Sequence, residues 1–285
     1  MPINAAAVGS PVEPYDVDVD ARKCLAYAAG MGETADVYFD DARDGGIVAP
    51  PAYVVSLEWP ASRDIRTTPA FGATPDETIR GVHAVQDTQF HRLIRPGERI
   101  RVSGEMVAVR RIKPGALTMT RIDLTTADGE KVATTHTTGI SRDVAVNGDD
   151  QVKEDAPGWP DDTPPGDWTE TVIPIPREMP HLYTECADIW NPIHTERAVA
   201  LAAGLPDIIL HGTATWALAV REVVADRLGG DPARLARFTG RFTGMVIPGT
   251  DITVRHAGTG QGAVYEVIAA DGSKAISAGR ALFRD

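Results

Sequence analysis

Residues 208–228 read I-I-L-H-G-T-A-T-W-A-L-A-V-R-E-V-V-A-D-R-L and are apolar on nearly every side as far as Val224. A helix with apolar residues all round is buried within a domain, because a surface helix keeps one polar face. Gly229 and Gly230 follow directly, and glycines at this position commonly end a helix. The stretch therefore predicts a central helix that other elements must enclose.

Antiparallel strands are predicted before and after this helix. Thr169 to Arg177 alternates between apolar and polar residues as a strand does, and four more strands follow at about 238–247, 250–257, 262–270 and 273–283. One curved antiparallel sheet wrapped around a buried helix is the hot-dog arrangement. We assign the second half of the chain to this fold.

Two short motifs recur in the same order in both halves of the chain. R-P-G-E-R-I-R-V at 95–102 is matched by I-P-G-T-D-I-T-V at 247–254, and A-D-G-E-K-V-A-T-T at 127–135 by A-D-G-S-K-A-I-S-A at 270–278. Pro-Gly before a strand and Asp-Gly at a hairpin are specific turn chemistry. The motifs are further apart in the first half, which predicts a longer hairpin there, around 110–117. The chain is therefore predicted to be an α+β protein of two tandem hot-dog units.

A linker separates the two predicted units. Residues 147–168 are rich in Asp, Pro and Gly and have no apolar periodicity, which is typical of a linker. We therefore predict an N-terminal unit at 1–146 and a C-terminal unit at 169–285. The first half offers a poorer copy of the central helix, within 47–59, and Pro50-Pro51 interrupts it. The N-terminal unit is therefore expected to be degenerate.

The composition excludes several classes of protein. The formal net charge of −12 argues against a nucleic-acid or anionic-membrane surface, since both need basic patches. Two cysteines, Cys24 and Cys186, form neither a disulfide framework nor a metal cluster, which indicates a reducing cytosol. The first residues lack the features of a signal peptide, and no window approaches the ~18 consecutive apolar residues of a membrane span. We expect a cytoplasmic protein with no membrane or nucleic-acid partner.

The segment Y-T-E-C-A-D-I-W-N-P-I-H-T-E-R-A at 183–198 holds candidate catalytic residues. Asn191 is a typical helix cap and Pro192 suits the first helical position, which places His194 in the first turn. A neutral imidazole on a fixed turn can activate a water molecule. Further on, the backbone N–H of Gly212 opens the central helix, where the helix dipole favours an oxygen that gains negative charge. A base at one helix start and an oxyanion donor at another suit thioester-enolate chemistry.

These segments resemble the motif of the MaoC-like, R-specific enoyl-CoA hydratases, also called hydratase 2. The matching residues are Tyr183, Asn191, Pro192, Ile193, His194, Gly204, Pro206, Ile209, Leu210, His211 and Gly212. The resemblance implies a double hot-dog lyase that needs no cofactor and acts on an acyl-CoA or acyl-carrier thioester. It also implies an Asp/His pair that binds the added water, a thioester carbonyl polarised by the N–H of Gly212, and a degenerate half that makes room for the acyl chain. A homodimer is expected on the same ground.

One position departs from the family pattern. The family's aspartate stands two residues before the asparagine, and here that residue is Ile189, whereas an aspartate occurs one place earlier, at Asp188. We take Asp188 as the provisional partner of His194 and Glu185 as a weaker substitute. The alternative is a non-catalytic or altered acyl-thioester-binding hot-dog protein, because Ile189 is neither an acid nor a base. Thioester hydrolysis ranks last, since 213–220 contains no acidic residue. We assign four residues to the candidate site: His194, Asp188, Asn191 and Gly212.

Other polar residues near the motif have simpler interpretations. His211 is expected to pack beside the helix start and Tyr183 to be a packing aromatic. Helix capping at Asn191 and close approach of a strand to Gly212 are alternatives to catalytic roles. Several arginines are expected to be mostly solvated, with CoA phosphates as the alternative: Arg221, Arg227, Arg234, Arg237 and Arg241.

Overall fold

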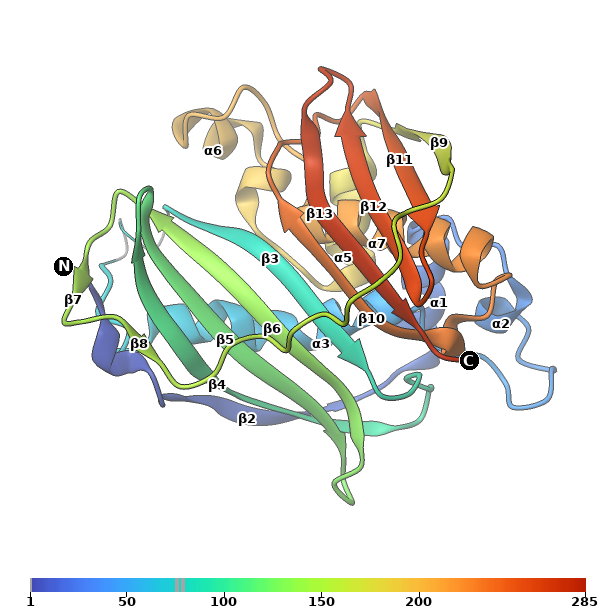
Figure 1. The fold of residues 1–285 in the computed structure, drawn as a ribbon, viewed down its shortest axis with the longest axis horizontal. Helices are drawn as coiled ribbons and strands as arrows, with labels where there is room; N and C mark the ends of the chain where they lie inside the picture. Colours follow the sequence, from blue (N-terminus) through green and yellow to red (C-terminus); the bar gives the residue numbers. More distant parts are fainter. Residues whose placement is uncertain (1, 75–76, 78–79) are drawn as a thin grey trace. The chain divides into compact units, whose positions relative to one another are not determined.

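The computed structural model describes residues 2–74, 77 and 80–285, and Figure 1 follows their helices and strands along the chain. Internal contacts divide the chain into two compact units. Unit 1 comprises Met1–Asp18, Leu57–His91 and Arg99–Pro160, and unit 2 comprises Val19–Ser56, Arg92–Glu98 and Asp161–Asp285.

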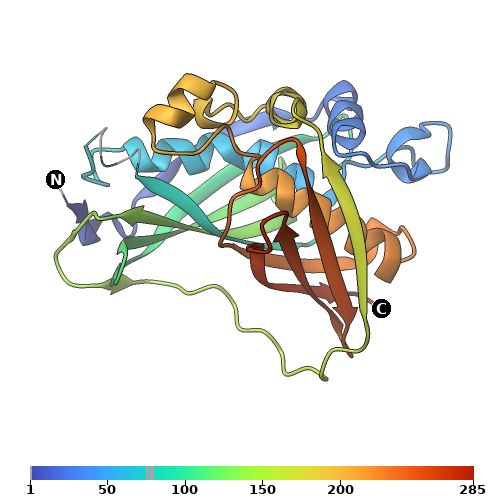
Figure 2. The same ribbon diagram turned by 90° about the horizontal axis from the view of Figure 1, so that it is seen from above.

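Unit 2 consists of an antiparallel sheet and a central helix. Its strands are β9 (Trp168–Ile175), β10 (Leu235–Phe242), β11 (Thr250–Gly258), β12 (Gly262–Ala269) and β13 (Lys274–Phe283). They pair in the order β10-β13-β12-β11-β9, and every pair is antiparallel. Helix α7 (Gly212–Arg227) contacts β10, β11, β12 and β13 and lies along one face of this sheet (Figure 2). This is the arrangement predicted for a hot-dog unit.

Apolar packing explains the position of α7. Its residues are buried continuously from Ala214 to Val220, and the Trp216 ring meets Phe238 of β10 edge to face, with 5.5 Å between the ring centroids. Phe238 in turn stacks on Tyr265 of β12 at 4.4 Å. Burial of one such aromatic side chain contributes ~2–3 kcal/mol, so these contacts account for a helix buried on most sides.

Unit 1 repeats this architecture with a more polar core. Its strands are β2 (Pro11–Asp18), β3 (Gly81–Phe90), β4 (Arg99–Ile112), β5 (Gly115–Thr126) and β6 (Lys131–Arg142), in the order β2-β4-β5-β6-β3. Helix α3 (Val54–Asp64), most of which belongs to this unit, carries the buried residue Glu58. The Glu58 carboxyl group is bonded by Gln86 Nε2 at 3.2 Å and by Thr135 Oγ1 at 2.6 Å. Strands β3 and β6 therefore meet the helix with polar side chains.

The internal repeat is confirmed by the strand order. β2-β4-β5-β6-β3 of unit 1 corresponds strand for strand to β9-β11-β12-β13-β10 of unit 2. Gly97 and Gly249 precede β4 and β11 with φ values of 86° and 88°, and Gly129 and Gly272 lie in the two later hairpins with 88° and 80°. Glycine adopts this left-handed region without strain, so the turn motifs recur because the backbone requires them. The longer hairpin predicted for the first half is also present, as β4 and β5.

Two predicted elements are corrected by the structure. The helix predicted within 47–59 begins only at Val54, after the short turn η2 (Pro51–Tyr53). Proline suits the first turn of a helix, where N–H groups have no intrahelical partner, so the prolines start this helix and do not interrupt it. The strand predicted at 238–247 ends at Phe242, because the Val246 carbonyl accepts the N–H of Leu210 instead of pairing in the sheet.

Residues of the first half complete the core of unit 2. Helix α1 (Ala21–Gly30) packs against α5 (Met179–Ala187), and the ring centroids of Tyr27 and Tyr183 are 6.1 Å apart. Arg221 of α7 donates a hydrogen bond to the Met31 carbonyl at 2.6 Å. The compact units therefore cross the predicted division at 146, and the assignment of 1–146 and 169–285 to separate domains stays a prediction.

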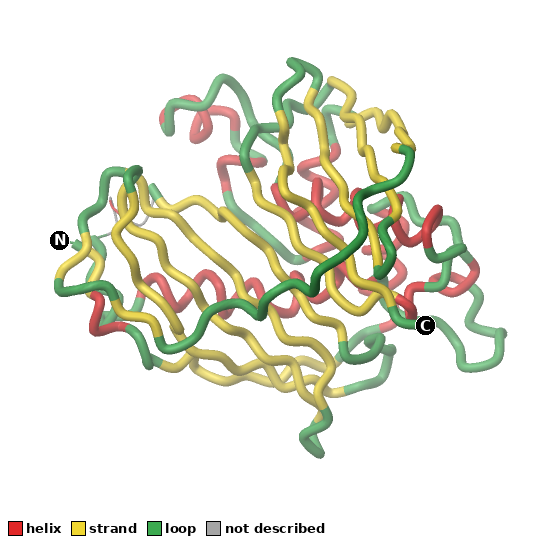
Figure 3. The backbone as a smooth tube through the Cα atoms, viewed as in Figure 1, coloured by secondary structure: helices red, strands yellow, loops and turns green. Residues whose placement is uncertain are grey.

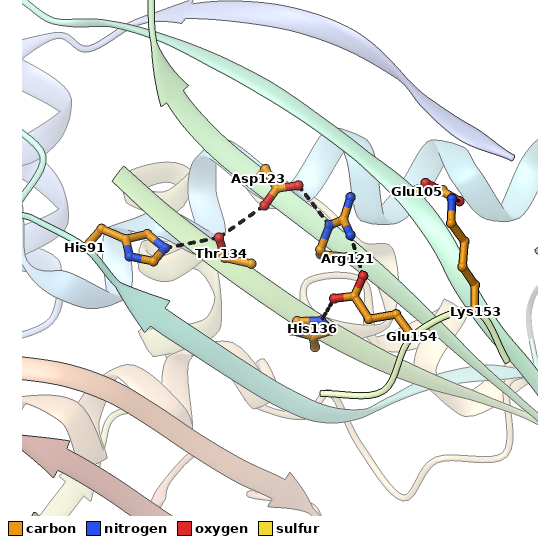
Figure 4. Close-up of polar contacts among 8 residues, drawn as sticks. All are labelled: His91, Glu105, Arg121, Asp123, Thr134, His136, Lys153 and Glu154. Atoms are coloured by element: carbon orange, nitrogen blue, oxygen red, sulfur yellow. Dashed lines mark hydrogen bonds and ion pairs between the residues drawn. The ribbon is translucent and has the colours of Figure 1, made fainter. Parts of the chain in front are cut away.

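The beginning of the predicted linker is fixed to unit 1. Strand β8 (Gln151–Val152) pairs with β4, and Glu154 then bonds Arg121 and, at 2.8 Å, His136 Nε2 (Figure 4). Residues 153–167, all of them described, form neither helix nor strand (Figure 3). The linker is thus irregular, as its composition predicts, but its first residues are held by charged side chains.

The remaining elements are short. Unit 1 also contains β1 (Ile3–Asn4), η1 (Ala5–Ala7), η3 (Ile65–Thr67) and β7 (Val146–Asn147), and unit 2 contains α2 (Asp36–Phe39), η4 (Pro192–His194), α6 (Arg197–Ala202) and η5 (Pro232–Arg234). Within the described ranges, no helix has both the length and the apolar character needed to cross a membrane.

Candidate active site

The end of helix α5 decides where Asp188 points. Asp188 follows the helix in a left-handed conformation, with φ 54° and ψ 34°, and its N–H and that of Ile189 both bond to the Thr184 carbonyl. A left-handed residue followed by a buried apolar one is a common helix ending. The Asp188 carboxylate is exposed and lies 2.6 Å from Lys23 Nζ of α1, whereas Ile189 is 3% exposed. The structure therefore does not bring Asp188 to His194.

His194 lies in a single 3-10 turn that is closed through the main chain. Its N–H donates to the Asn191 carbonyl at 3.0 Å. Asn191 is the N-cap residue and Pro192 the first residue of the turn, as predicted, but the Asn191 side chain makes no capping hydrogen bond within the described residues. The turn is closed by the bond from the His194 N–H to the Asn191 carbonyl, so it does not need the Asn191 side chain. The side-chain amide of Asn191 can therefore bind another partner. Asn191 is partly buried three residues before His194.

A hydrogen bond fixes the tautomer of His194. Its Nδ1 lies 2.8 Å from the carbonyl oxygen of Ile209. Because a carbonyl only accepts, Nδ1 carries the proton and Nε2 keeps an unprotonated lone pair. Burial lowers the pKa of His194 to about 4, partly opposed by the hydrogen bond to Ile209. At neutral pH the side chain is therefore a neutral base with Nε2 free to accept a proton.

The residue brought against His194 is His211. The two ring centroids are 3.8 Å apart and the ring planes meet at 26°, so the imidazoles are stacked. Burial, followed by the effect of His194, lowers the pKa of His211 to about 2. His211 Nε2 lies 3.3 Å from Thr184 Oγ1. The sequence predicts that His211 packs beside the start of the central helix. It does not predict the contact with His194, although the two residues lie in adjoining motifs.

Gly212 is the first residue of α7, as predicted. The first N–H groups of a helix have no partner within it, and the helix dipole favours an anion there. A Cβ atom at Gly212 would lie 3.1 Å from Cδ1 of Phe242, at the end of β10. Close approach of a strand thus explains the glycine, and it remains compatible with the N–H acting as an oxyanion donor.

The other residues named from the sequence have structural contacts. Tyr183 is fully buried, with its ring centroid 4.9 Å from that of His211, so it is a packing aromatic. Arg227 donates to Thr169 Oγ1 and His256, and Arg234 and Arg241 are exposed. Arg237 is buried, which corrects its expected solvation, because its side chain leaves β10 on a covered face.

Metal ligation has no support in the part of the chain that the structure describes. No group of three His, Cys, Asp or Glu side chains there is placed to hold an ion. The hydrogen bonds of His194 and His211 go to a backbone carbonyl and a threonine hydroxyl, which leaves no carboxylate bonded to either ring among the described residues.

The fold and the site together define a hot-dog protein with a neutral histidine beside the start of its central helix. Residues 164–278 match the family described as MaoC like domain, and residues 6–135 match the FAS1-like dehydratase domain region. The second half of the chain therefore matches the MaoC-like domain, and the first half matches a dehydratase-related region.

Curated relatives match along nearly the whole chain. An enoyl-CoA hydratase of Mycobacterium tuberculosis (ChsH3) is 25% identical over 97% of this chain and 96% of its own length. A 3-hydroxyacyl-thioester dehydratase of the same organism (dehydratase Y) is 28% identical over 96% of this chain and 95% of its own length. A crystal structure of a MaoC-like dehydratase from Phytophthora capsici superposes with a TM-score of 0.83, at 20% identity over 98% of both chains. That structure supports the fold, and the two relatives extend the similarity to both halves.

Proposed function

We propose that this chain catalyses the reversible addition of water to the C2–C3 double bond of a 2-enoyl thioester, with His194 as the general base. The hydrogen bond from His194 Nδ1 to the Ile209 carbonyl, at 2.8 Å, carries the proposal because it leaves Nε2 free. One relative is named for hydration of an enoyl-CoA and the other for dehydration of a 3-hydroxyacyl thioester. These names support the same reaction in its two directions.

In the hydration direction, His194 Nε2 takes a proton from water while the water oxygen bonds to C3. The electrons of the C2–C3 double bond move to the thioester oxygen, and the N–H of Gly212 stabilises that oxyanion. The imidazolium then gives its proton to C2, which regenerates the neutral base. One water is thereby incorporated into a 3-hydroxyacyl thioester, and dehydration reverses each step. A preorganised oxyanion donor contributes about 3 kcal/mol to such a step.

The Asn191 amide is proposed to orient the water in place of a carboxylate. It lies next to the turn of His194, and its side chain is not used as a cap within the described residues. An amide can hold a water by a hydrogen bond but does not exchange a proton at neutral pH. All proton transfer is therefore assigned to His194, in contrast to the Asp/His pair that the family resemblance implies.

The wider assignment is a CoA thioester substrate, no bound cofactor, a cytoplasmic location and a homodimer. The two cysteines, Cys24 and Cys186, are buried free thiols, which supports a reducing compartment. Water addition to an enoyl thioester needs no redox or electron-sink group, which supports a reaction without a cofactor.

The test uses the purified full chain with short, long and branched trans-2-enoyl-CoAs. Loss of the conjugated-thioester absorbance measures turnover. His194→Gln is expected to lower kcat/KM by about 10²- to 10⁴-fold, the usual contribution of a general base. His91→Gln makes the same chemical change in unit 1 and is the matched control. Unchanged turnover in His194→Gln excludes the mechanism, and thioester binding without any turnover favours the acyl-thioester-binding alternative.

A further inference from the structure

The imidazoles of His194 and His211 are stacked beside the start of α7. His211 immediately precedes α7 and is 2% exposed, and one face of its ring covers one face of His194. Ile189, the residue at the family's aspartate position, is apolar and 3% exposed, and Nδ1 of His211 has no hydrogen-bond partner among the described residues. Among the described residues, His194 therefore contacts a stacked imidazole and a backbone carbonyl, and no carboxylate is bonded to it.

Two residues of α5 also contact His211. Thr184 Oγ1 of α5 lies 3.3 Å from its Nε2, and the Tyr183 ring lies 4.9 Å from it at a tilt of 55°. Tyr27 of α1 packs behind Tyr183 and itself meets the Tyr53 ring, with 5.4 Å between the centroids. His211 is therefore packed against a group of buried aromatic rings as well as against His194.

We propose that His211 is the positioning residue of this site: its ring keeps water from one face of His194 and so holds His194 neutral and directed toward the substrate. The effect on turnover rests on the proposed function. The effect on His194 itself does not, because the ionisation of His194 can be measured in the resting protein.

The physical basis is desolvation without charge. An imidazolium next to an apolar, water-free surface is disfavoured, and a neutral ring offers no negative charge to offset that cost. A carboxylate partner has the opposite effect, because it stabilises the imidazolium and raises the histidine pKa. Two titratable residues of α5 lie near His211: the Tyr183 ring contacts it, and a charge on His181 would lower the pKa of His211 further. The stack therefore favours a base that stays unprotonated in mildly acidic solution.

The test measures His194 by NMR and by kinetics in the full chain. The seven histidines are labelled with ¹³C, and the Cε1–H signal of His194 is assigned from its loss in His194→Gln. His211→Ala removes the ring and admits water, so the His194 pKa is expected to rise by about one unit or more toward its ordinary value of ~6.5. His211→Phe keeps the ring without its nitrogens and is expected to leave the His194 pKa near its wild-type value. His211→Gln keeps a hydrogen-bonding group without the ring and should behave like the alanine variant.

The value of kcat/KM falls in acid as the general base becomes protonated. The apparent pKa of this fall should shift in each variant by the same amount as the His194 pKa measured by NMR. A folded His211→Ala or His211→Gln variant with an unshifted His194 signal overturns the proposal. A shift in His211→Phe as large as in His211→Ala also overturns it, because the nitrogens rather than the ring would then be responsible. A further outcome is that the His194 NMR signal shifts as expected in the variants while the wild-type protein shows no turnover. That result rejects the proposed function and leaves the positioning role of His211 supported.

Discussion

The carboxylate of Asp188 lies 2.6 Å from the ammonium group of Lys23, and the next residue, Ile189, is buried. This arrangement follows from the left-handed backbone of Asp188, which directs its side chain outward at the end of α5. The only aspartate near the family's position therefore belongs to the surface. The proposed mechanism therefore rests on His194 and His211, which are stacked in the buried segment.

Asp188→Asn is expected to change kcat/KM by less than about tenfold, since the carboxylate faces Lys23 and not the reacting atoms. The stability change should also be small, because an exposed ion pair contributes ~0–1 kcal/mol. Steady-state kinetics on enoyl-CoAs and urea unfolding check both statements. If turnover instead falls by about two orders of magnitude while stability is unchanged, Asp188 turns inward during the reaction.

Ile189→Asp is expected to destabilise the protein by about 2–4 kcal/mol, because it places a carboxylate in a position that is 3% exposed. Ile189→Val is the matched control and should cost about 1 kcal/mol, the usual effect of removing one buried methylene. Urea denaturation of the three proteins gives the difference. If Ile189→Asp is as stable as Ile189→Val and turns over faster, the position is hydrated and accepts the family's acid.

Stability should fall in acid because of the histidine pair. The pKa values of His194 and His211 are lowered to about 4 and about 2, mainly by burial, so the unfolded chain binds protons more readily than the folded one. Their contribution is present above pH ~6.5 and is lost as the pH falls toward 4 for His194 and toward 2 for His211. The free energy of unfolding, measured by urea at several pH values, should decline less steeply in His211→Phe than in the wild type. Equal slopes in the two proteins would mean that His211 has the same pKa in the folded and unfolded states.

Glu58 of unit 1 should give the opposite dependence. Burial raises the pKa of this carboxyl group to about 8, against the hydrogen bonds of Thr135 and Gln86, which lower it. Its stabilising effect is present below the unfolded pKa of ~4.3 and is lost as the pH rises toward 8. Glu58→Gln keeps the shape without the charge, so its unfolding free energy should not decline between pH 5 and 8 as the wild type's does. A parallel decline in both proteins would assign the pH dependence to other groups.

Much of the fold was accessible from local patterns. The Pro-Gly and Asp-Gly turns located equivalent strands in both halves because each requires a glycine with positive φ. The buried character of α7 also followed from its lack of a polar face, and its start at Gly212 was predicted. The helix of the first half was misplaced, since a proline at a helix start and a proline inside one look alike in the sequence.

By itself the sequence determined the repeat, the central helix of the second half and the place of His194, because turn chemistry and apolar periodicity are local properties of the chain. Only the tertiary structure decided which side chains meet. Asp188 turns to Lys23 because a left-handed residue ends α5, and His211 reaches His194 because the segment before α7 folds back along the turn that carries it. Residues 19–56 join unit 2 for the same reason: burial and stacking join segments distant in the chain, and no local pattern records that contact.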